Sequence, residues 1–145
     1  QFDPDLGHVA NVSPANPTLL NQLLQADFLP IISSIGVDLQ GRLMNVNADQ
    51  AAITIAKLID ADLVMLSDVD GVLDADKQRL PQLNQGQIEQ LIADKVITDG
   101  MIVKVNAALE AAKDLGRGVD IANWKHPDKL TALLNGEIVG TRINP

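Results

Sequence analysis

Three polar clusters of the chain combine residue types that can handle phosphate or carboxylate chemistry. They lie at residues 45–50 (Asn-Val-Asn-Ala-Asp-Gln), 67–74 (Ser-Asp-Val-Asp-Gly-Val-Leu-Asp) and 98–105 (Thr-Asp-Gly-Met-Ile-Val-Lys-Val). Amide and ammonium side chains, together with exposed backbone N–H groups, can bind anions and stabilise a phosphoryl group during transfer. Each cluster also has a purely structural explanation.

The first cluster stands at the predicted start of a helix over residues 47–59. Asn47, followed three residues later by Gln50, matches the capping-box pattern, and the backbone N–H groups of a helix start attract anions. Asn45 and Asn47 could hydrogen-bond a polar ligand, and Asp49 could hold a cation. Since Asn and Asp are favoured at helix caps in any case, capping alone could also account for the cluster.

The second cluster follows an apolar segment, residues 63–66, that we predict to be a buried strand. Gly71 would let a phosphate or a ribose approach the backbone closely at the end of that strand. A calcium-binding EF-hand loop is excluded: with Gly71 at the glycine position, Leu66 would be the first ligand and Lys77 would replace the bidentate Glu. A tight turn rich in Asp and Gly is the structural alternative.

The third cluster contains Lys104, within a helix predicted over residues 101–115. At 100° per residue, Lys104 is the one charge on an otherwise apolar arc of that helix. A desolvated ammonium needs a partner or an anionic ligand, although a lysine side chain can also extend past apolar surface to reach water. The apolar neighbours on this arc are Met101, Ala108, Ala111, Ala112 and Leu115.

The elements that would position these clusters alternate between helix and strand. We predict helices with Ser13 and Pro14 as N-cap and first turn, ending near Gln25, and at 47–59, 88–93, 101–115 (ended by Gly116) and after Pro127. We predict buried strands at 28–34, 62–66 and 119–122, a turn and short return at 37–44, and a last strand at 138–143. This order predicts a three-layer αβα sandwich with a largely parallel sheet, whose ligands bind beyond the carboxyl ends of the strands.

Composition narrows the class of protein. The 145 residues carry a net charge of −8 and only 2% aromatic side chains, a balance that argues against nucleic-acid binding. The chain has no cysteine, no apolar run of about 20 residues and no signal peptide, so we expect a cytoplasmic protein without a membrane span. It begins with Gln rather than Met, so we expect a piece of a longer polypeptide.

Taken in order, the three clusters resemble the acetylglutamate kinases, a branch of the amino-acid kinase family. The resemblance runs from about Gly7 to Arg142. Asn-x-Asn-x-Asp followed by Ala-Ala at 45–52, and Thr-Asp-Gly-Met with its Lys at 98–104, are its specific motifs, whereas the Ser-Asp-Val-x-Gly turn at 67–71 is shared more widely. The resemblance implies an open αβα sandwich that uses ATP, with Mg²⁺ held mainly by the ATP phosphates, to phosphorylate the side-chain carboxylate of N-acetyl-L-glutamate in arginine biosynthesis.

The resemblance also implies roles for individual residues. Asn45 and Asn47 would bind acetylglutamate, Asp49 would organise the catalytic lysines, and Lys104 would stabilise the transferring phosphoryl group. No residue is assigned to direct metal binding. The residues implied to contact the nucleotide are Ser67, Asp68, Val69, Asp70, Gly71, Val72, Leu73, Val96, Ile97, Thr98 and Met101.

On this resemblance, residues 1–145 form the C-terminal, nucleotide-binding part of the kinase. The N-terminal half of the family carries a second catalytic lysine, a Gly-rich turn for the phosphates and an Arg for the substrate carboxylate, and nothing in this chain matches them. We therefore expect the chain alone to be inactive. A homodimer is expected for the complete protein.

Two other classes of function remain open from the residues. Asp68 after an apolar strand imitates the nucleophile of haloacid-dehalogenase-type phosphatases, in which it would form a phospho-aspartate, but no acidic pair follows a later strand to hold magnesium. A non-catalytic nucleotide-binding module would bind ATP without turnover. Sister kinases acting on aspartate, glutamate, carbamate or UMP share the fold, and the Asn-x-Asn-x-Asp cluster argues against them.

Overall fold

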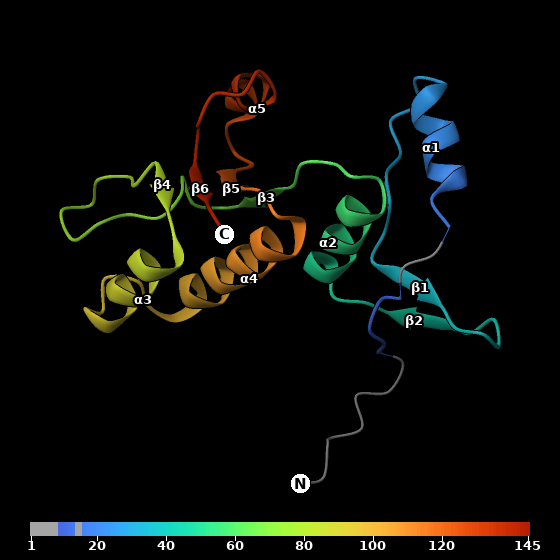
Figure 1. Cartoon of the computed structure of the whole chain (residues 1–145), viewed down its shortest axis with the longest axis horizontal. Helices are drawn as coiled ribbons and strands as arrows, with labels where there is room; N and C mark the ends of the chain where they lie inside the picture. The colour runs from blue at the N-terminus through green and yellow to red at the C-terminus, as the bar shows by residue number, and fades with distance from the viewer. Residues whose placement is uncertain (1–8, 14–15) are drawn as a thin grey trace, which may run out of the picture. The chain divides into compact units, whose positions relative to one another are not determined.

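The computed structural model describes residues 9–13 and 16–145, and the chain divides into two compact units, Gln1–Ala61 and Asp62–Pro145. The elements of the first unit are α1 (Thr18–Gln25), β1 (Ile35–Val37), β2 (Leu43–Asn45) and α2 (Ala48–Leu58). Those of the second unit are β3 (Val64–Ser67), β4 (Gln82–Leu83), α3 (Gln85–Ala93), α4 (Asp99–Leu115), β5 (Val119–Asn123), α5 (Pro127–Leu134) and β6 (Thr141–Ile143). Figure 1 shows these elements, coloured from blue at the N-terminus to red at the C-terminus.

In the first unit, β1 and β2 form an antiparallel hairpin, in agreement with the turn and short return predicted at 37–44. The Asp38 carboxylate closes its turn by accepting from the backbone N–H groups of Gln40 and Arg42, each at 2.9 Å. Helix α2 then begins after Asn47, whose side-chain oxygen accepts from the backbone N–H of Asp49 at 2.9 Å and of Gln50 at 3.1 Å. Asn47 is confirmed as the cap, although the reciprocal bond to the Gln50 side chain that completes a capping box is not among the bonds of this helix start.

Helix α1 begins later than predicted. It starts at Thr18, whose backbone N–H donates to the Asn16 side chain at 2.9 Å, and so Asn16 serves the first turn in place of the expected Ser13. Ser13 lies outside the helix, and Pro14 lies outside the described residues. The end of the helix at Gln25 agrees with the prediction.

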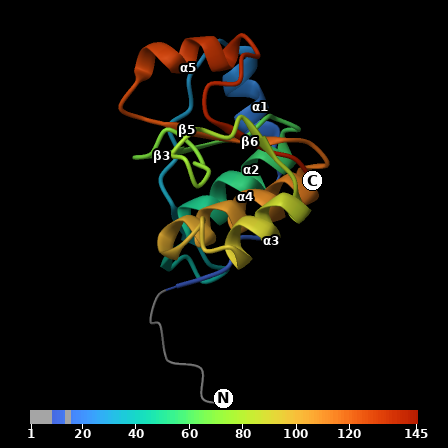
Figure 2. The same cartoon turned by 90° about the vertical axis from the view of Figure 1, so that its left-hand side faces the viewer.

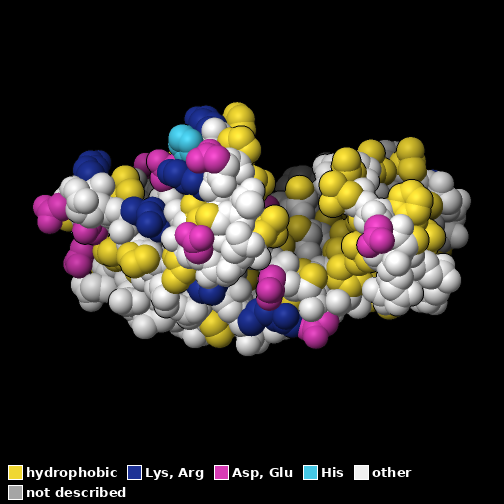
Figure 3. Space-filling model, turned by 90° about the horizontal axis from the view of Figure 1, so that it is seen from above, with side chains coloured by type: hydrophobic (Ala, Val, Ile, Leu, Met, Phe, Trp, Pro, Cys, Tyr) yellow, Lys and Arg dark blue, Asp and Glu magenta, His cyan; other side chains and the backbone are white. Residues whose placement is uncertain are grey.

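The buried strand predicted at 28–34 is wrong. This segment forms no strand, and the first strand begins only at Ile35. Its apolar side chains are exposed, with Leu29 at 86% and Ile31 at 93%. Pro30 lacks the N–H that a central strand donates to its neighbour, and none of the described strands pairs with the segment. Hydrophobic side chains accordingly gather at the surface on the right of Figure 3, where the first unit is seen.

The second unit contains a four-stranded sheet in the order β3-β5-β6-β4. The pairs β3–β5 and β4–β6 are parallel, and β6 runs antiparallel to β5. Helix α4 packs against β5 and β6, with α3 beside it. Figures 1 and 2 place α5 on the opposite side of this sheet. The predicted α/β class is thus confirmed, with a sheet that is mixed and mostly parallel.

The core of the second unit lies between α4 and the sheet. Ala108, Ala111 and Ala112 on α4 are fully buried, and small side chains let the helix approach the strands closely. Gly116 ends α4 in the left-handed conformation at φ 67°, as predicted. Helix α3 begins three residues before its predicted start, because Asn84 and Gln87 form a reciprocal capping box with both bonds at 3.0 Å.

Candidate functional site

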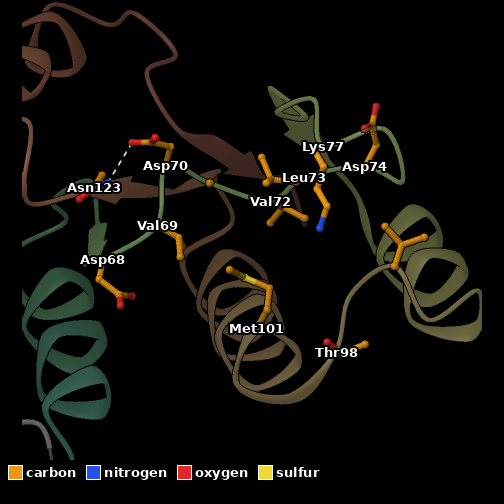
Figure 4. A pocket seen from close by; sticks show the side chains of 12 residues that line it. Asp68, Val69, Asp70, Val72, Leu73, Asp74, Lys77, Thr98, Met101 and Asn123 are labelled. Atoms are coloured by element: carbon orange, nitrogen blue, oxygen red, sulfur yellow. Dashed lines mark hydrogen bonds between the residues drawn. The ribbon is translucent and has the colours of Figure 1, made fainter.

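A cavity of about 390 Å³ opens beyond the carboxyl end of β3 in the second unit (Figure 4). That volume lies within the range of small-molecule sites, roughly 300–1,000 Å³. Two separate segments form most of the wall, the turn after β3 and the start of α4. The lining residues are Asp68, Val69, Asp70, Gly71, Val72, Leu73, Asp74, Lys77, Val96, Thr98, Met101 and Asn123.

The structure brings together nine of the eleven residues predicted to contact the nucleotide. The two that do not line the cavity are Ser67 and Ile97, which are buried, at 6% and 2% exposure. Ile97 belongs to the connection between α3 and α4, and Ser67 is the last residue of β3. Two segments separated by more than 20 residues therefore form one site: the turn at the carboxyl end of β3, where such sheets bind ligands, and the start of α4.

The turn after β3 lies directly on strand β6. Gly71 has φ 131°, a conformation that residues with side chains rarely adopt. A Cβ at this position would lie 2.6 Å from the Thr141 hydroxyl oxygen and 3.2 Å from the Thr141 nitrogen. The glycine predicted to allow close approach of a ligand is thus also required by the contact between the turn and the strand.

Beyond Gly71 the chain forms a small hairpin that provides one wall of the cavity. The Leu80 N–H donates to the Val72 oxygen at 2.8 Å, and the Asp74 N–H donates to the Gln78 oxygen at 2.8 Å. The Asp74 carboxylate closes the tip by accepting from the backbone N–H of Gln78 at 2.8 Å. In Figure 4 the Lys77 amine points from this hairpin toward the side of the cavity where Thr98 lies.

Lys104 reaches the end of β3 from the second turn of α4. Its ammonium donates to the Ser67 hydroxyl and lies 3.5 Å from Asp68 Oδ1. The Lys104 charge therefore lies beside the turn that lines the cavity, with Ser67 and Asp68 as its partners. The lysine side chain is 40% exposed.

The two carboxylates of the turn have separate partners. The pKa of Asp68 is lowered by its own backbone N–H, then by hydrogen bonds from Ser67 and Lys104. The pKa of Asp70 is lowered chiefly by the Asn123 amide, which donates to it at 2.9 Å. Both groups are ionised at neutral pH. The Lys104 ammonium offsets part of the negative charge of Asp68, whereas the neutral Asn123 amide leaves the charge of Asp70 in place.

The cavity is also lined by three residues that are not among the predicted nucleotide contacts: Asp74, Lys77 and Asn123. Asn123 ends β5, which pairs in parallel with β3, so the rule that ligands bind beyond strand ends could have found it. Asp74 is the last residue of the second polar cluster, whereas Lys77 reaches the site only through the hairpin, which we did not predict.

The remaining predicted site residues belong to the first unit. Asn45 ends β2 with an exposed side chain. Both Asp49 and Asn47 are exposed at the start of α2, where the side-chain oxygen of Asn47 accepts the two capping bonds. Asn47 thus caps the helix, as the structural alternative for this cluster expected. Capping uses only its side-chain oxygen, so its side-chain nitrogen could still bind a ligand. Asp49 adds a negative charge to the first turn, where the helix dipole favours it.

Neither a metal cluster nor a membrane span emerges from the residues described. Over residues 9–13 and 16–145, no group of three or more His, Asp or Glu side chains is placed to hold a metal ion. No helix in those same ranges is long and apolar enough to cross a membrane.

Comparison with known proteins assigns the class. The sequence profile of the amino acid kinase family matches residues 1–123, and the chain belongs to this family. Among curated relatives, "Acetylglutamate kinase" of Pasteurella multocida (strain Pm70) is 77% identical over all 145 residues, as is the protein of the same name from Mannheimia succiniciproducens. In both cases the chain covers 56% of the relative, so it spans little more than half the length of these proteins.

Solved structures agree on the fold. The protein smu.665 from Streptococcus mutans UA159 matches 99% of this chain and 54% of its own at 28% identity, with a TM-score of 0.74. An N-acetylglutamate synthase from Neisseria gonorrhoeae matches 95% of this chain and 32% of its own at 21% identity, with a TM-score of 0.80. The latter likeness concerns the fold alone. Membership of the amino acid kinase family leaves the phosphatase alternative without support, and Asp68 is engaged with Ser67 and Lys104.

Proposed function

We propose that this chain is the C-terminal, nucleotide-binding part of an acetylglutamate kinase. The observation that carries the proposal is the convergence of the predicted nucleotide contacts on one cavity, in a chain 77% identical to proteins of that name. A side-chain carboxylate oxygen of N-acetyl-L-glutamate would attack the γ-phosphorus of ATP, the bond to the β-phosphate oxygen would break, and ADP would leave. The acyl phosphate formed would serve arginine biosynthesis in the cytoplasm.

The cavity suits a nucleotide substrate. The Gly71 turn can bring backbone close to a ligand, and Thr98 and Met101 stand at the start of a 17-residue helix, where backbone N–H groups favour phosphate. Lys77 and Lys104 add positive charge at the wall and beside the turn. Mg²⁺ would be held mainly by the ATP phosphates, where it would offset their charge.

The chemical step asks the protein for positioning and charge stabilisation, because the acceptor is already a carboxylate and needs no general base. Lys104 would stabilise the charge on the transferring phosphoryl group. Asn45 would bind acetylglutamate, with Asn47 contributing its amide nitrogen, and Asp49 would orient the catalytic lysines. The complete protein, with its N-terminal half, would form a homodimer.

The direct test compares this chain with the complete polypeptide that contains it. We expect acetylglutamate-dependent release of ADP from the complete polypeptide and none from the purified chain, because nothing in the chain matches the second lysine or the Gly-rich phosphate turn of the family. A coupled ADP assay measures both. ADP release by the chain alone would contradict the division of roles, and ATP binding without turnover by the complete polypeptide would favour a non-catalytic nucleotide module.

Asn45 should discriminate between the two substrates. Its side chain is exposed at the end of β2, in the first unit, whereas the cavity that we assign to the nucleotide belongs to the second. In the complete polypeptide, Asn45→Ala should raise the KM for acetylglutamate about tenfold, as for one lost hydrogen bond to a charged group, and leave the KM for ATP within about twofold. Steady-state kinetics with each substrate varied in turn checks this. Equal increases in both constants would refute the assignment.

A further inference from the structure

Thr141, at the start of β6, is fully buried and joins three parts of the second unit through one hydroxyl group. The hydroxyl accepts from the Val72 backbone N–H at 2.8 Å and donates to the Leu80 carbonyl oxygen at 2.7 Å. Val72 and Leu80 are the two ends of the hairpin that forms one wall of the cavity, and they also bond to each other. One side chain thus fastens both ends of the hairpin to the sheet.

The backbone on both sides of Thr141 packs closely against its neighbours, and the hairpin makes a further contact with it. A Cβ on Gly140 would overlap the carbonyl oxygen of Ile121 in β5, so this segment lies against the sheet. On its other side, Gly71 leaves space for the Thr141 hydroxyl, as described above. The Arg79 guanidinium, from the returning arm of the hairpin, donates to the Gly140 carbonyl.

We propose that Thr141 is a positioning residue for nucleotide binding, a role that rests on the proposed function. Thr141 does not line the cavity. It acts through the backbone from Gly71 to Leu80, which carries the wall residues Val72, Leu73, Asp74 and Lys77. Without the hydroxyl, the Val72 N–H loses its partner inside the protein, and a buried unpaired donor favours conformations that expose it to water. The wall would move, and ATP would have to reorder it on binding.

The experiment uses the complete polypeptide with three variants. Thr141→Val replaces the hydroxyl by a methyl group of similar size, Thr141→Ser keeps the hydroxyl, and Arg142→Lys weakens a different contact of the same strand. Arg142 forms a bidentate pair with the buried Asp120, at 3.0 and 2.8 Å, and lysine keeps the charge but loses the paired geometry. Equilibrium binding of a fluorescent ATP analogue, melting temperature and steady-state kinetics are measured for each.

We expect Thr141→Val to raise the Kd for the analogue and the KM for ATP about tenfold, as for one lost buried hydrogen bond. The kcat at saturating ATP should stay within about twofold, since the hairpin is reordered once ATP is bound. Thr141→Ser should bind within about threefold of the parent. Arg142→Lys should lower the melting temperature and leave the Kd within about twofold. Amide hydrogen exchange at Val72 should accelerate in Thr141→Val only.

A folded Thr141→Val variant with the parent's Kd would overturn the proposal, as would an Arg142→Lys variant that loses as much affinity, since general destabilisation would then explain both. Should Thr141→Val not fold, Thr141→Ala removes the hydroxyl without adding a methyl group and is judged by the same Kd. If the parent itself does not bind the ATP analogue, the proposed function fails instead, and the two failures are distinct.

Discussion

Lys104→Ala in the complete polypeptide should lower turnover by about 10² to 10³, the usual cost of removing one electrostatic stabiliser of a transition state. The ammonium lies beside Ser67 and Asp68 at the end of β3, next to the cavity that we propose for the nucleotide, and the lysine side chain is 40% exposed. In the variant, a phosphoryl group that develops negative charge beside this turn would no longer be stabilised by the Lys104 ammonium. Because the lost interaction belongs to the transition state, kcat should fall more than the affinity for ATP.

The same variant should fold normally. The ion pair with Asp68 is exposed on both sides, 40% and 64%, and solvent screens such pairs. Alanine is also a better helix former than lysine. The melting temperature should therefore change little.

The matched control is Lys113→Ala, which removes an exposed lysine from the last turn of the same helix. It should keep turnover within about twofold of the parent. Near-normal turnover of a folded Lys104→Ala variant would reduce Lys104 to a lysine that merely extends to solvent. Comparable losses in the Lys104 and Lys113 variants would point to a general effect of positive charge.

Most of the features that the sequence predicts depend on interactions between residues close together in the chain. Asn47 caps α2 through bonds to residues two and three positions away, and Gly116 ends α4 through its own backbone conformation. The early start of α3 was available in the same way, because Asn84 and Gln87 have the spacing of a capping box. In these interactions both partners lie within a few residues of each other, so a sequence pattern is enough to predict them.

The errors and omissions arise where distant segments decide the outcome. The apolar run at 28–34 has the composition of a buried strand, but burial requires a partner that the run itself does not specify. Thr141 bonds to Val72 across 69 residues, and Asn123 bonds to Asp70 across 53. No spacing of residues in the sequence predicts these contacts. Predicting them requires the order of the strands in the sheet.

The turn after β3 is predicted from the sequence to contact the nucleotide, and the structure gives its glycine a second role. Gly71 was selected because glycine lets a ligand approach the backbone, and the structure adds that glycine also lets β6 approach from behind. The turn therefore lies between the sheet and the cavity with no room for a side chain toward the sheet. A substitution of Gly71 should therefore disturb both the contact with β6 and the lining of the cavity.

Gly71→Ala in the complete polypeptide should weaken ATP binding by about 10- to 100-fold. An added Cβ would lie 2.6 Å from the Thr141 hydroxyl oxygen and 3.3 Å from the Gly140 carbonyl carbon, and the second of these atoms belongs to backbone that cannot rotate away. The φ of 131° adds strain, which costs roughly 1–3 kcal/mol for such conformations. Relief of the clash requires the turn to move away from β6, and the turn lines the cavity. Each 1.4 kcal/mol that is needed to return the turn to its position on ATP binding lowers the affinity about tenfold.

Gly86→Ala provides the control, because this glycine lies in α3 and its added Cβ would meet only the Asn84 side chain at an ordinary 3.6 Å. Alanine there should keep the affinity for ATP and raise the melting temperature slightly, since it favours the helix. Equilibrium titration with an ATP analogue and a thermal melt give both quantities. If Gly71→Ala melts lower but binds ATP as tightly as the parent, the turn tolerates displacement, and its backbone is not what holds the nucleotide.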